Sequence, residues 1–397
     1  MTRFNYENAE HAAAVINLKS YIKALLSGTD PRAAYEAHES QFANLTATIV
    51  FQSFYETLQS GGTEEELLTV IPKVILATQS HFDNQPTALE DDPFLAEFRA
   101  ENEKMLALFD EIRPLTIEAR TVKRDERIVE VLSGLTSYGA HFSRMQNILF
   151  PTLEREERSF HALSLLWAWH DRCKESLRTA LRVYADRSVP QSELNRVIGE
   201  LFANYVSLPI KEERFLFPAA ATTLRAEDWT SMYDQARVYP VAFGIRAEEE
   251  IAYEQEEVTS GEYHSTTGSL SFEQLNMILR HLPVDFTVVD ENDRVLYFSD
   301  SPHRIFPRSP AIIGREVKNC HPPKSLSVVE DIISAFREGR ESHMRFWLEH
   351  HGRKLLIEYF CLRDDRQRYR GVLEVSQDIT ELSQLKGEQR LGSWLAR

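Results

Sequence analysis

The 397-residue sequence has few cysteines and no long apolar run. Cys173, Cys320 and Cys361 form no C-x-x-C pair, so neither a disulfide framework nor a thiolate metal cluster is expected. No apolar run approaches the roughly 20 residues that cross a bilayer, and the N-terminus lacks a basic segment followed by an apolar one. These absences predict a cytoplasmic protein that has no contact with a membrane.

Positive charge is also scarce. Lys and Arg total 45 against 61 Asp and Glu, which gives a formal net charge of −16. This charge opposes the phosphates of nucleic acid, so direct binding to nucleic acid is not expected. The sequence also lacks a phosphate-binding glycine loop, an H-E-x-x-H pair and a G-x-S-x-G elbow. We therefore expect no enzyme of the common nucleotide or hydrolase classes.

What is present is a helical pattern followed by a strand pattern. Apolar residues make up 43% of the chain, enough for several cores over this length. Short helices are predicted over 11–79. Four longer helices, typical of a four-helix bundle, are predicted over 94–115, 123–153, 160–184 and 193–221. An acidic stretch and then a Thr/Ser/Gly-rich stretch predict a flexible linker over 246–270.

The segment 282–299 contains two apolar runs that flank a four-residue polar tip, which predicts an antiparallel hairpin. Further strands are predicted over 344–349, 354–362 and 371–378, with a helix over 327–338. The simplest assembly is a small antiparallel sheet with helices on one face.

This order of elements resembles the PAS family of sensor domains over about 271–384. The resemblance implies a five-stranded antiparallel sheet, a pocket for a small molecule, and flanking helices that pair with a second copy or a protein partner. It is carried by VDENDR at 289–294, IFPR at 305–308, IGR at 313–315, NCHPPK at 319–324 and the closing DIT at 378–380.

Within this region, Cys320 and His321 are candidate ligands for a haem iron or another molecule in the PAS pocket. The alternative is that Pro322 and Pro323 end an extended segment and His321 only packs locally. Both interpretations stay open at this point.

The helical half resembles the hemerythrin-like HHE cation-binding bundles, and the N-terminal helices resemble the domain of unknown function that accompanies them. The resemblance is carried by FRAEN at 98–102, YGAHFSRMQNILFP at 138–151, LWAWHD at 166–171 and KEERFLFP at 211–218. It implies two iron ions held by imidazoles and carboxylates. On this chain the matching metal ligands are Glu101, His141, His170, and Glu212 or Glu213.

Two positions depart from the family pattern. Position 146 is Gln where a carboxylate is expected, and Asp91 and Asp92 precede Pro93 where the family has a His-Pro pair. Three interpretations follow: an unusual metal site that recruits one of these aspartates, a bundle that has lost its metal, or a weak site for one ion. If the metal is lost, the glutamates should face solvent or meet Arg and His partners, because a buried lone carboxylate is costly.

We therefore expect a cytoplasmic bacterial sensory or regulatory protein, with an all-α part and an α+β PAS domain. It would sense a small molecule, a metal or a redox state and signal by association with itself or a partner. The alternatives are an iron-handling or iron-centre repair protein and a ligand-free scaffold. The expected parts are N-terminal helices 1–88, the bundle 89–245, the linker 246–270, the PAS domain 271–385 and a tail 386–397.

Overall fold

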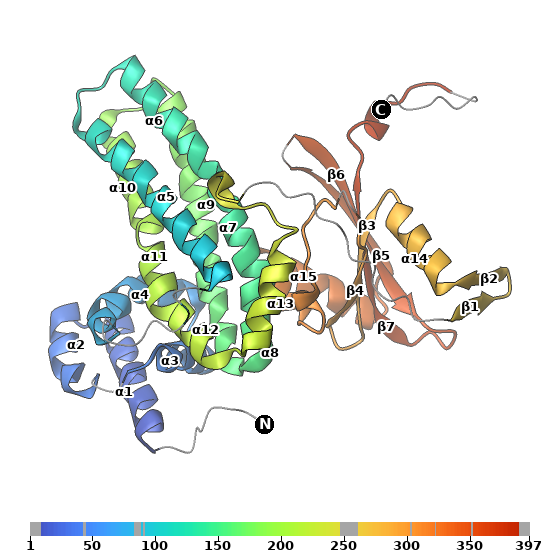
Figure 1. Ribbon diagram of the computed structural model, residues 1–397, viewed down its shortest axis with the longest axis horizontal. Helices are drawn as coiled ribbons and strands as arrows, with labels where there is room; N and C mark the ends of the chain where they lie inside the picture. Colours follow the sequence, from blue (N-terminus) through green and yellow to red (C-terminus); the bar gives the residue numbers. More distant parts are fainter. Residues whose placement is uncertain are drawn as a thin grey trace. The chain divides into compact units, whose positions relative to one another are not determined.

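The computed structural model describes residues 9–42, 45–82, 89, 92–246, 261–301, 304–321, 323–350 and 352–388. It divides into two compact units, formed mainly by residues 1–252 and 253–397. The first unit is helical and the second contains a five-stranded antiparallel sheet, which confirms the predicted fold class (Figure 1). Among the described residues, no helix combines the length and the apolar character that a membrane crossing requires.

The first unit begins with short helices, as predicted. Thr63 starts the fourth of them through a capping box, in which its hydroxyl accepts from the Glu66 N–H and the Glu66 carboxylate accepts from the Thr63 N–H. These helices are α1 (Ala9–Leu26), α2 (Pro31–His38), α3 (Ala47–Gln59) and α4 (Glu64–Thr78).

Four long helical segments follow and lie side by side as a bundle (Figure 1). The first and third are single helices, whereas the second and fourth are interrupted. The first segment is α5 (Pro93–Ile117), and the third is α9 (Leu163–Ala185). The second contains α6 (Val122–Leu135), α7 (Gly139–Arg144) and α8 (Phe150–Glu156). The fourth contains α10 (Gln191–Tyr205), α11 (Leu208–Lys211) and α12 (Phe217–Thr223). A further helix, α13 (Ala226–Ala236), comes after them.

The interruptions in the second and fourth segments include two π turns, η4 (Met145–Leu149) and η6 (Glu212–Leu216). Each π turn is followed by a Phe-Pro pair that opens the next helix, with Pro151 in α8 and Pro218 in α12. Proline lacks an N–H and its ring clashes with the carbonyl four residues earlier, which disfavours a regular α-helix at this point. A π turn accommodates the proline and is a common feature of functional helices.

One apolar core runs through the whole first unit. It extends from Leu18 and Val74 of the N-terminal helices to Phe109 and Leu201 of the bundle, each of which is almost fully buried. The segments predicted as two separate domains therefore share a core and are stabilised together.

The second unit has strands β3 (Asp285–Val289), β4 (Val295–Phe298), β5 (His343–His350), β6 (Arg353–Arg363) and β7 (Tyr369–Asp378), in the order β4-β3-β7-β6-β5. These bounds agree with the predicted strands. The β3–β4 turn is closed by the Asp290 carboxylate, which accepts from the backbone N–H groups of Asn292 and Arg294 at 2.9 Å each. Helix α15 (Pro323–Arg337) packs Ile332, Ile333 and Phe336 into the core of this unit.

Two further elements precede the sheet. Helix α14 (Phe272–His281) leads into the hairpin of β3 and β4. The described end of the predicted linker is not irregular, because β1 (Glu262–Ser265) and β2 (Gly268–Ser271) form a small hairpin. The acidic part of the linker, 247–260, lies outside the described residues.

Among the described glycines, Gly371 on β7 is the one at which a side chain would be least tolerated. Its φ is +128°, and an added Cβ would lie 1.9 Å from the Val289 carbonyl oxygen. We expect Gly371→Ala to destabilise the sheet unit by about 2 kcal/mol or more, because both the conformation and the contact are strained. Hydrogen exchange of β3 and β7 peptides in the full chain measures this effect.

Gly339→Ala is the matched control, since Gly339 also has a positive φ of +75° but only the Arg363 Nη2 atom near its added Cβ, at 3.7 Å. The control should cost only about 1 kcal/mol, the price of the backbone conformation alone. Equal exchange in the two variants would contradict the proposed steric clash.

Candidate functional site

Four polar side chains meet at the centre of the bundle. Glu101 comes from α5, His141 from α7, His170 from α9 and Glu212 from the π turn η6, and each is 0% exposed. The structure thus brings together four of the five predicted ligands. The fifth, Glu213, is half-buried beside them.

His141 lies between two carboxylates. Its Nδ1 is 2.9 Å from Glu101 Oε2 and its Nε2 is 3.2 Å from Glu212 Oε1. Burial opposes a positive charge on the ring, but the Glu212 and Glu101 carboxylates outweigh burial and raise the pKa of His141. The two carboxylates therefore favour the charged form of the ring, and both ring nitrogens contact glutamate oxygens.

Arg144 is a fully buried cation in the same cluster. It lies three residues after His141, so both side chains project from the same face of the second segment. Its Nη2 is 2.5 Å from Glu101 Oε2, its Nη1 is 2.5 Å from Glu97 Oε2, and its guanidinium lies 4.5 Å from the centre of the Phe98 ring. Arg144 therefore supplies a positive charge directly to Glu101.

The charge of Glu101 is held by three neighbours. Besides His141 and Arg144, the backbone N–H of Ala242 donates to Glu101 Oε1 at 2.5 Å. Burial alone would raise the pKa of Glu101, but the bond from His141 and the charges of His141 and Arg144 lower it. Glu101 is therefore an ionised carboxylate whose oxygens are already engaged.

Asn102 organises the glutamates of the fourth segment. Its Nδ2 donates to Glu212 Oε2 at 3.0 Å and to Glu213 Oε1 at 2.9 Å, and its Oδ1 accepts from the Tyr138 hydroxyl. Burial raises the pKa of Glu213, although the hydrogen bond from Asn102 lowers it in part. Neither Asn102 nor Arg144 was predicted from the sequence to belong to the site. The available signal was their position within the FRAEN and YGAHFSR segments.

His170 differs from His141 in charge. Its Nδ1 is 3.2 Å from the Gln146 Nε2 atom, its Nε2 is 3.9 Å from Glu212 Oε1, and its ring stacks on Phe142 at 4.3 Å. Burial and the nearby cations of Lys174 and His141 hold the pKa of His170 well below its usual value. His170 is therefore a neutral imidazole, and the Gln146 amide beside it carries no negative charge that would favour protonation of the ring.

These contacts do not fit a pair of iron ions. Position 146 supplies an amide in place of a bridging carboxylate, Glu101 is paired with Arg144, and both nitrogens of His141 face carboxylates. Within the part of the chain that the structure describes, no three His, Cys, Asp or Glu side chains are grouped so that they could hold a metal ion. Asp92 caps α5, accepting from the Leu95 N–H at 3.1 Å, and Asp91 lies outside the described residues.

The predicted haem ligands are neighbours in the chain. Cys320 ends the 3₁₀ turn η9 (Val317–Cys320), His321 follows it, and both are half-buried. A cleft of the sheet unit is lined by other residues, among them Arg280, Asp285 and Arg353. Haem ligation by Cys320 or His321 stays a prediction.

Comparisons with known proteins match two segments of the chain. Residues 94–220 match the model of the hemerythrin HHE cation binding domain, and residues 275–380 match a PAS domain model. Among solved structures, the C-terminal domain of a protein from Streptococcus mutans is 34% identical over 32% of this chain and 98% of that one, with a TM-score of 0.31. The PAS domain of a protein from Colwellia psychrerythraea is 15% identical over 28% of this chain and 97% of that one, with a TM-score of 0.23. No curated protein matches the chain.

The Arg144–Glu101 pair can be measured by a double-mutant cycle of Arg144→Met and Glu101→Gln. Each single change removes one of the two counter-charges of a buried partner, so we expect a loss of about 3 kcal/mol in the free energy of unfolding. The double variant should lose less than the sum, with a coupling energy of about 2 kcal/mol. Denaturant unfolding of the full chain gives all four values.

The matched control is the surface pair Arg127–Glu111, whose atoms lie 3.0 Å apart with side chains 48% and 50% exposed. Its coupling energy should stay below about 1 kcal/mol, because water and salt screen it. A coupling at the buried pair no larger than at the surface pair would contradict the assigned role of Arg144.

Iron uptake tests whether Arg144 and Gln146 prevent this cluster from binding metal. Gln146→Glu supplies the missing carboxylate, and Arg144→Met releases Glu101. We expect the double variant to bind more iron after anaerobic loading with Fe²⁺ than either single variant, and its thermal midpoint to rise on loading. Elemental analysis and thermal unfolding measure the two effects. Equal uptake by the wild type and the double variant would show that Arg144 and Gln146 do not control metal binding.

Proposed function

The chain carries a hemerythrin HHE cation binding domain followed by a PAS domain, and we propose that it is a sensory or regulatory protein in which the PAS domain takes up a small polar molecule. Binding of this molecule to the PAS domain would change how the protein associates with a second copy or with a protein partner. In this proposal the bundle serves as a stable, charge-compensated helical platform. No reaction is assigned to it.

A cleft of the sheet unit, lined by both charged and apolar residues, is the observation that carries the proposal. It has a volume of about 450 Å³, within the range of small-molecule sites, and lies between the end of α14, the start of β3 and adjacent positions of β6 and β7. Arg280 and Arg353 line it together with Asp285 and Asp378. A ligand with both donor and acceptor groups would match this mixture of charges.

Asp285 is the most buried of these charged residues and is 6% exposed. Its carboxylate accepts from the Ile305 N–H at 2.5 Å, and burial raises its pKa despite this bond and the nearby Arg304. A buried carboxylate of this kind is well suited to recognise a donor group, since a new hydrogen bond would offset part of its desolvation.

Exposed apolar side chains supply a surface for self-association. Helix α14 has no buried residue, and Phe272, Met277 and Ile278 are 39%, 49% and 45% exposed. Trp347 on β5 is 65% exposed. Apolar residues clustered on an amphipathic helix are typical of a face that binds another protein, so we propose that α14 contributes to a homodimer.

A second candidate function is iron handling by the bundle, favoured by the convergence of His141, His170 and Glu212. It requires redox-active metal in the protein as purified. The ion pair of Arg144 with Glu101 and the engaged nitrogens of His141 argue against it. A scaffold without any ligand is the remaining alternative.

The proposed dimer is tested by Ile278→Glu, which places a charge on the apolar side of α14. We expect the wild type to sediment as a dimer at micromolar concentration and the variant as a monomer, because an unpaired charge in an apolar interface is costly. Ser327→Glu is the control, since Ser327 is exposed on α15 and the substitution adds the same charge elsewhere.

Native mass spectrometry of the same samples reports co-purified small molecules. A wild type that is monomeric and carries no molecule would refute the sensory proposal and favour the scaffold. Dimers in the wild type and in both variants would instead move the interface away from α14.

A further inference from the structure

Strand β5 forms one edge of the five-stranded sheet. It pairs with β6 along its whole length, from His343, which lies opposite Phe360, to His350, which lies opposite Arg353. Among the described residues, no strand pairs with the other side of β5. The unpaired backbone groups of an edge strand are a template on which a further strand can add to the sheet.

The bonds to β6 determine which backbone groups of β5 face the open edge. In an antiparallel ladder, alternate residues of a strand direct their N–H and C=O groups to the same neighbour. The Ser342 C=O accepts from the Cys361 N–H at 2.9 Å, so the even-numbered residues of β5 bond to β6. The N–H and C=O groups of Arg345, Trp347 and Glu349 therefore point toward the edge.

The side chains of the same three residues share one face of the sheet, because side chains alternate between the two faces along a strand. Trp347 is 65% exposed, the side chain of Arg345 is 56% exposed, and Glu349 is exposed as well. Trp347 lies midway between the two charged residues, two positions from each. The edge strand thus presents an aromatic ring flanked at equal spacing by opposite charges.

This pattern is complementary to itself in an antiparallel pair. If two copies of β5 lie antiparallel about Trp347, Arg345 of each copy is opposite Glu349 of the other, and Phe346 is opposite Leu348 on the other face. Residues directly opposite each other have Cβ atoms about 5 Å apart, which is within reach of an ion pair. Charged side chains on an edge strand usually oppose pairing with another chain, whereas here both charge pairs attract.

We propose that β5 pairs antiparallel with β5 of a second copy, centred on Trp347, so that two five-stranded sheets form one continuous sheet. The outward backbone groups of Arg345, Trp347 and Glu349 exchange hydrogen bonds across the pair. The two Trp347 rings meet on one face, where opposed aromatic side chains stabilise a strand pair. Arg345 keeps its contact with Glu358, at 2.6 Å, because a guanidinium has five N–H donors.

This contact goes beyond the proposed dimer through α14, because it uses different residues of the sheet unit. One pair of short strands buries less surface than a stable dimer requires, so the contact is transient. We expect half-association at roughly 100 µM, well above the micromolar range in which the α14 dimer is measured. At high local concentration the two contacts together would link dimers into larger assemblies.

Charge reversal tests the proposal in the full chain carrying Ile278→Glu, which removes the α14 contact. Arg345→Glu creates two Glu–Glu pairs across the edge, and Glu349→Arg creates two Arg–Arg pairs. We expect each reversal alone to weaken association at least about tenfold, because like charges directly opposite repel. An equimolar mixture of the two variants restores both Glu–Arg pairs and should associate as the unreversed protein does. Sedimentation equilibrium from roughly 20 to 500 µM measures this association.

Arg370→Glu is the matched control. Arg370 is exposed on β7, inside the sheet, and its Nε lies 3.2 Å from Asp364 Oδ2. This variant loses an ion pair within the sheet unit, as Arg345→Glu does, but it should leave association unchanged. If α14 holds no dimer, Ile278→Glu has no effect at micromolar concentration, and the comparison of separate with mixed variants still reports on β5.

Hydrogen exchange supplies a readout that needs no change in β5. In the Ile278→Glu protein, the amides of 343–350 should exchange more slowly at high concentration, because the outward N–H groups become bonded. Three outcomes would overturn the proposal: exchange of this segment that does not depend on concentration, a mixture that associates no more strongly than its separate components, or an equal loss of association in Arg370→Glu and Arg345→Glu.

Discussion

Glu101 and Glu212 are carboxylates buried at the centre of the bundle, and their neighbours must compensate for the lost hydration of these groups. The desolvation of one such ion costs several kcal/mol after relaxation of the protein. Here Arg144 and the His141 imidazolium supply the opposite charges, and Asn102 and the Ala242 N–H supply further hydrogen bonds. In a metal-binding bundle cations would provide this compensation, whereas here side chains and backbone of the same chain provide it.

The compensation extends outward from Arg144. Its other nitrogen contacts Glu97, which also binds Arg246 through its two oxygens at 2.5 and 2.7 Å. Arg246 lies beyond α13, so this chain of ion pairs joins the end of the helical unit to α5. Networks of this kind are costly to break at one member, because the remaining charges stay buried. The cluster therefore specifies how the helices pack, and not only what they can bind.

Much of this architecture could be predicted from the sequence. The polar tip at 290–293, the strands of the sheet and the four bundle segments follow from local patterns, because apolar periodicity and turn residues act over short distances. The inward positions of Glu101, His141, His170 and Glu212 followed from the hemerythrin-like segments. The π turns were not predicted, although Pro151 and Pro218 each mark the end of one. The sequence shows where a proline lies, but local patterns do not show whether the preceding turn of the helix is α or π.

The partners of these residues could not be predicted in the same way. In the sequence, Arg144 has no feature that distinguishes it from other arginines of an amphipathic helix. Only folding brings it into contact with Glu97, 47 residues away, and with Glu101. Asn102 likewise reaches Glu212 across 110 residues. Such contacts depend on the relative rotation of helices. Periodicity alone does not determine that rotation closely enough to identify pairs.

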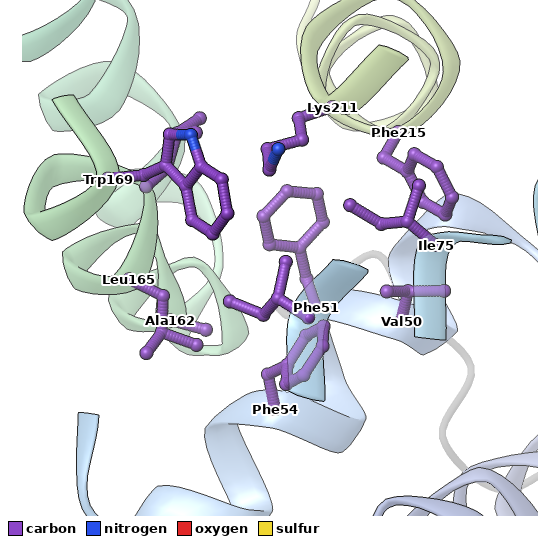
Figure 2. Close-up of a pocket in the computed structure, with 11 residues that line it drawn as sticks. Val50, Phe51, Phe54, Ile75, Ala162, Leu165, Trp169, Lys211 and Phe215 are labelled. Carbon is purple, nitrogen blue, oxygen red and sulfur yellow. The ribbon is translucent and has the colours of Figure 1, made fainter. Parts of the chain in front are cut away.

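The adjacent residues Lys211 and Glu212 show how these local and distant effects combine. Successive residues of a helix project about 100° apart. Lys211 therefore faces an apolar cavity beside α3 and α4 (Figure 2), while Glu212 faces His141 and Asn102. The two side chains share one stretch of backbone at the start of the π turn. Adjacent residues of one helical segment therefore line the boundary with the N-terminal helices and the centre of the bundle.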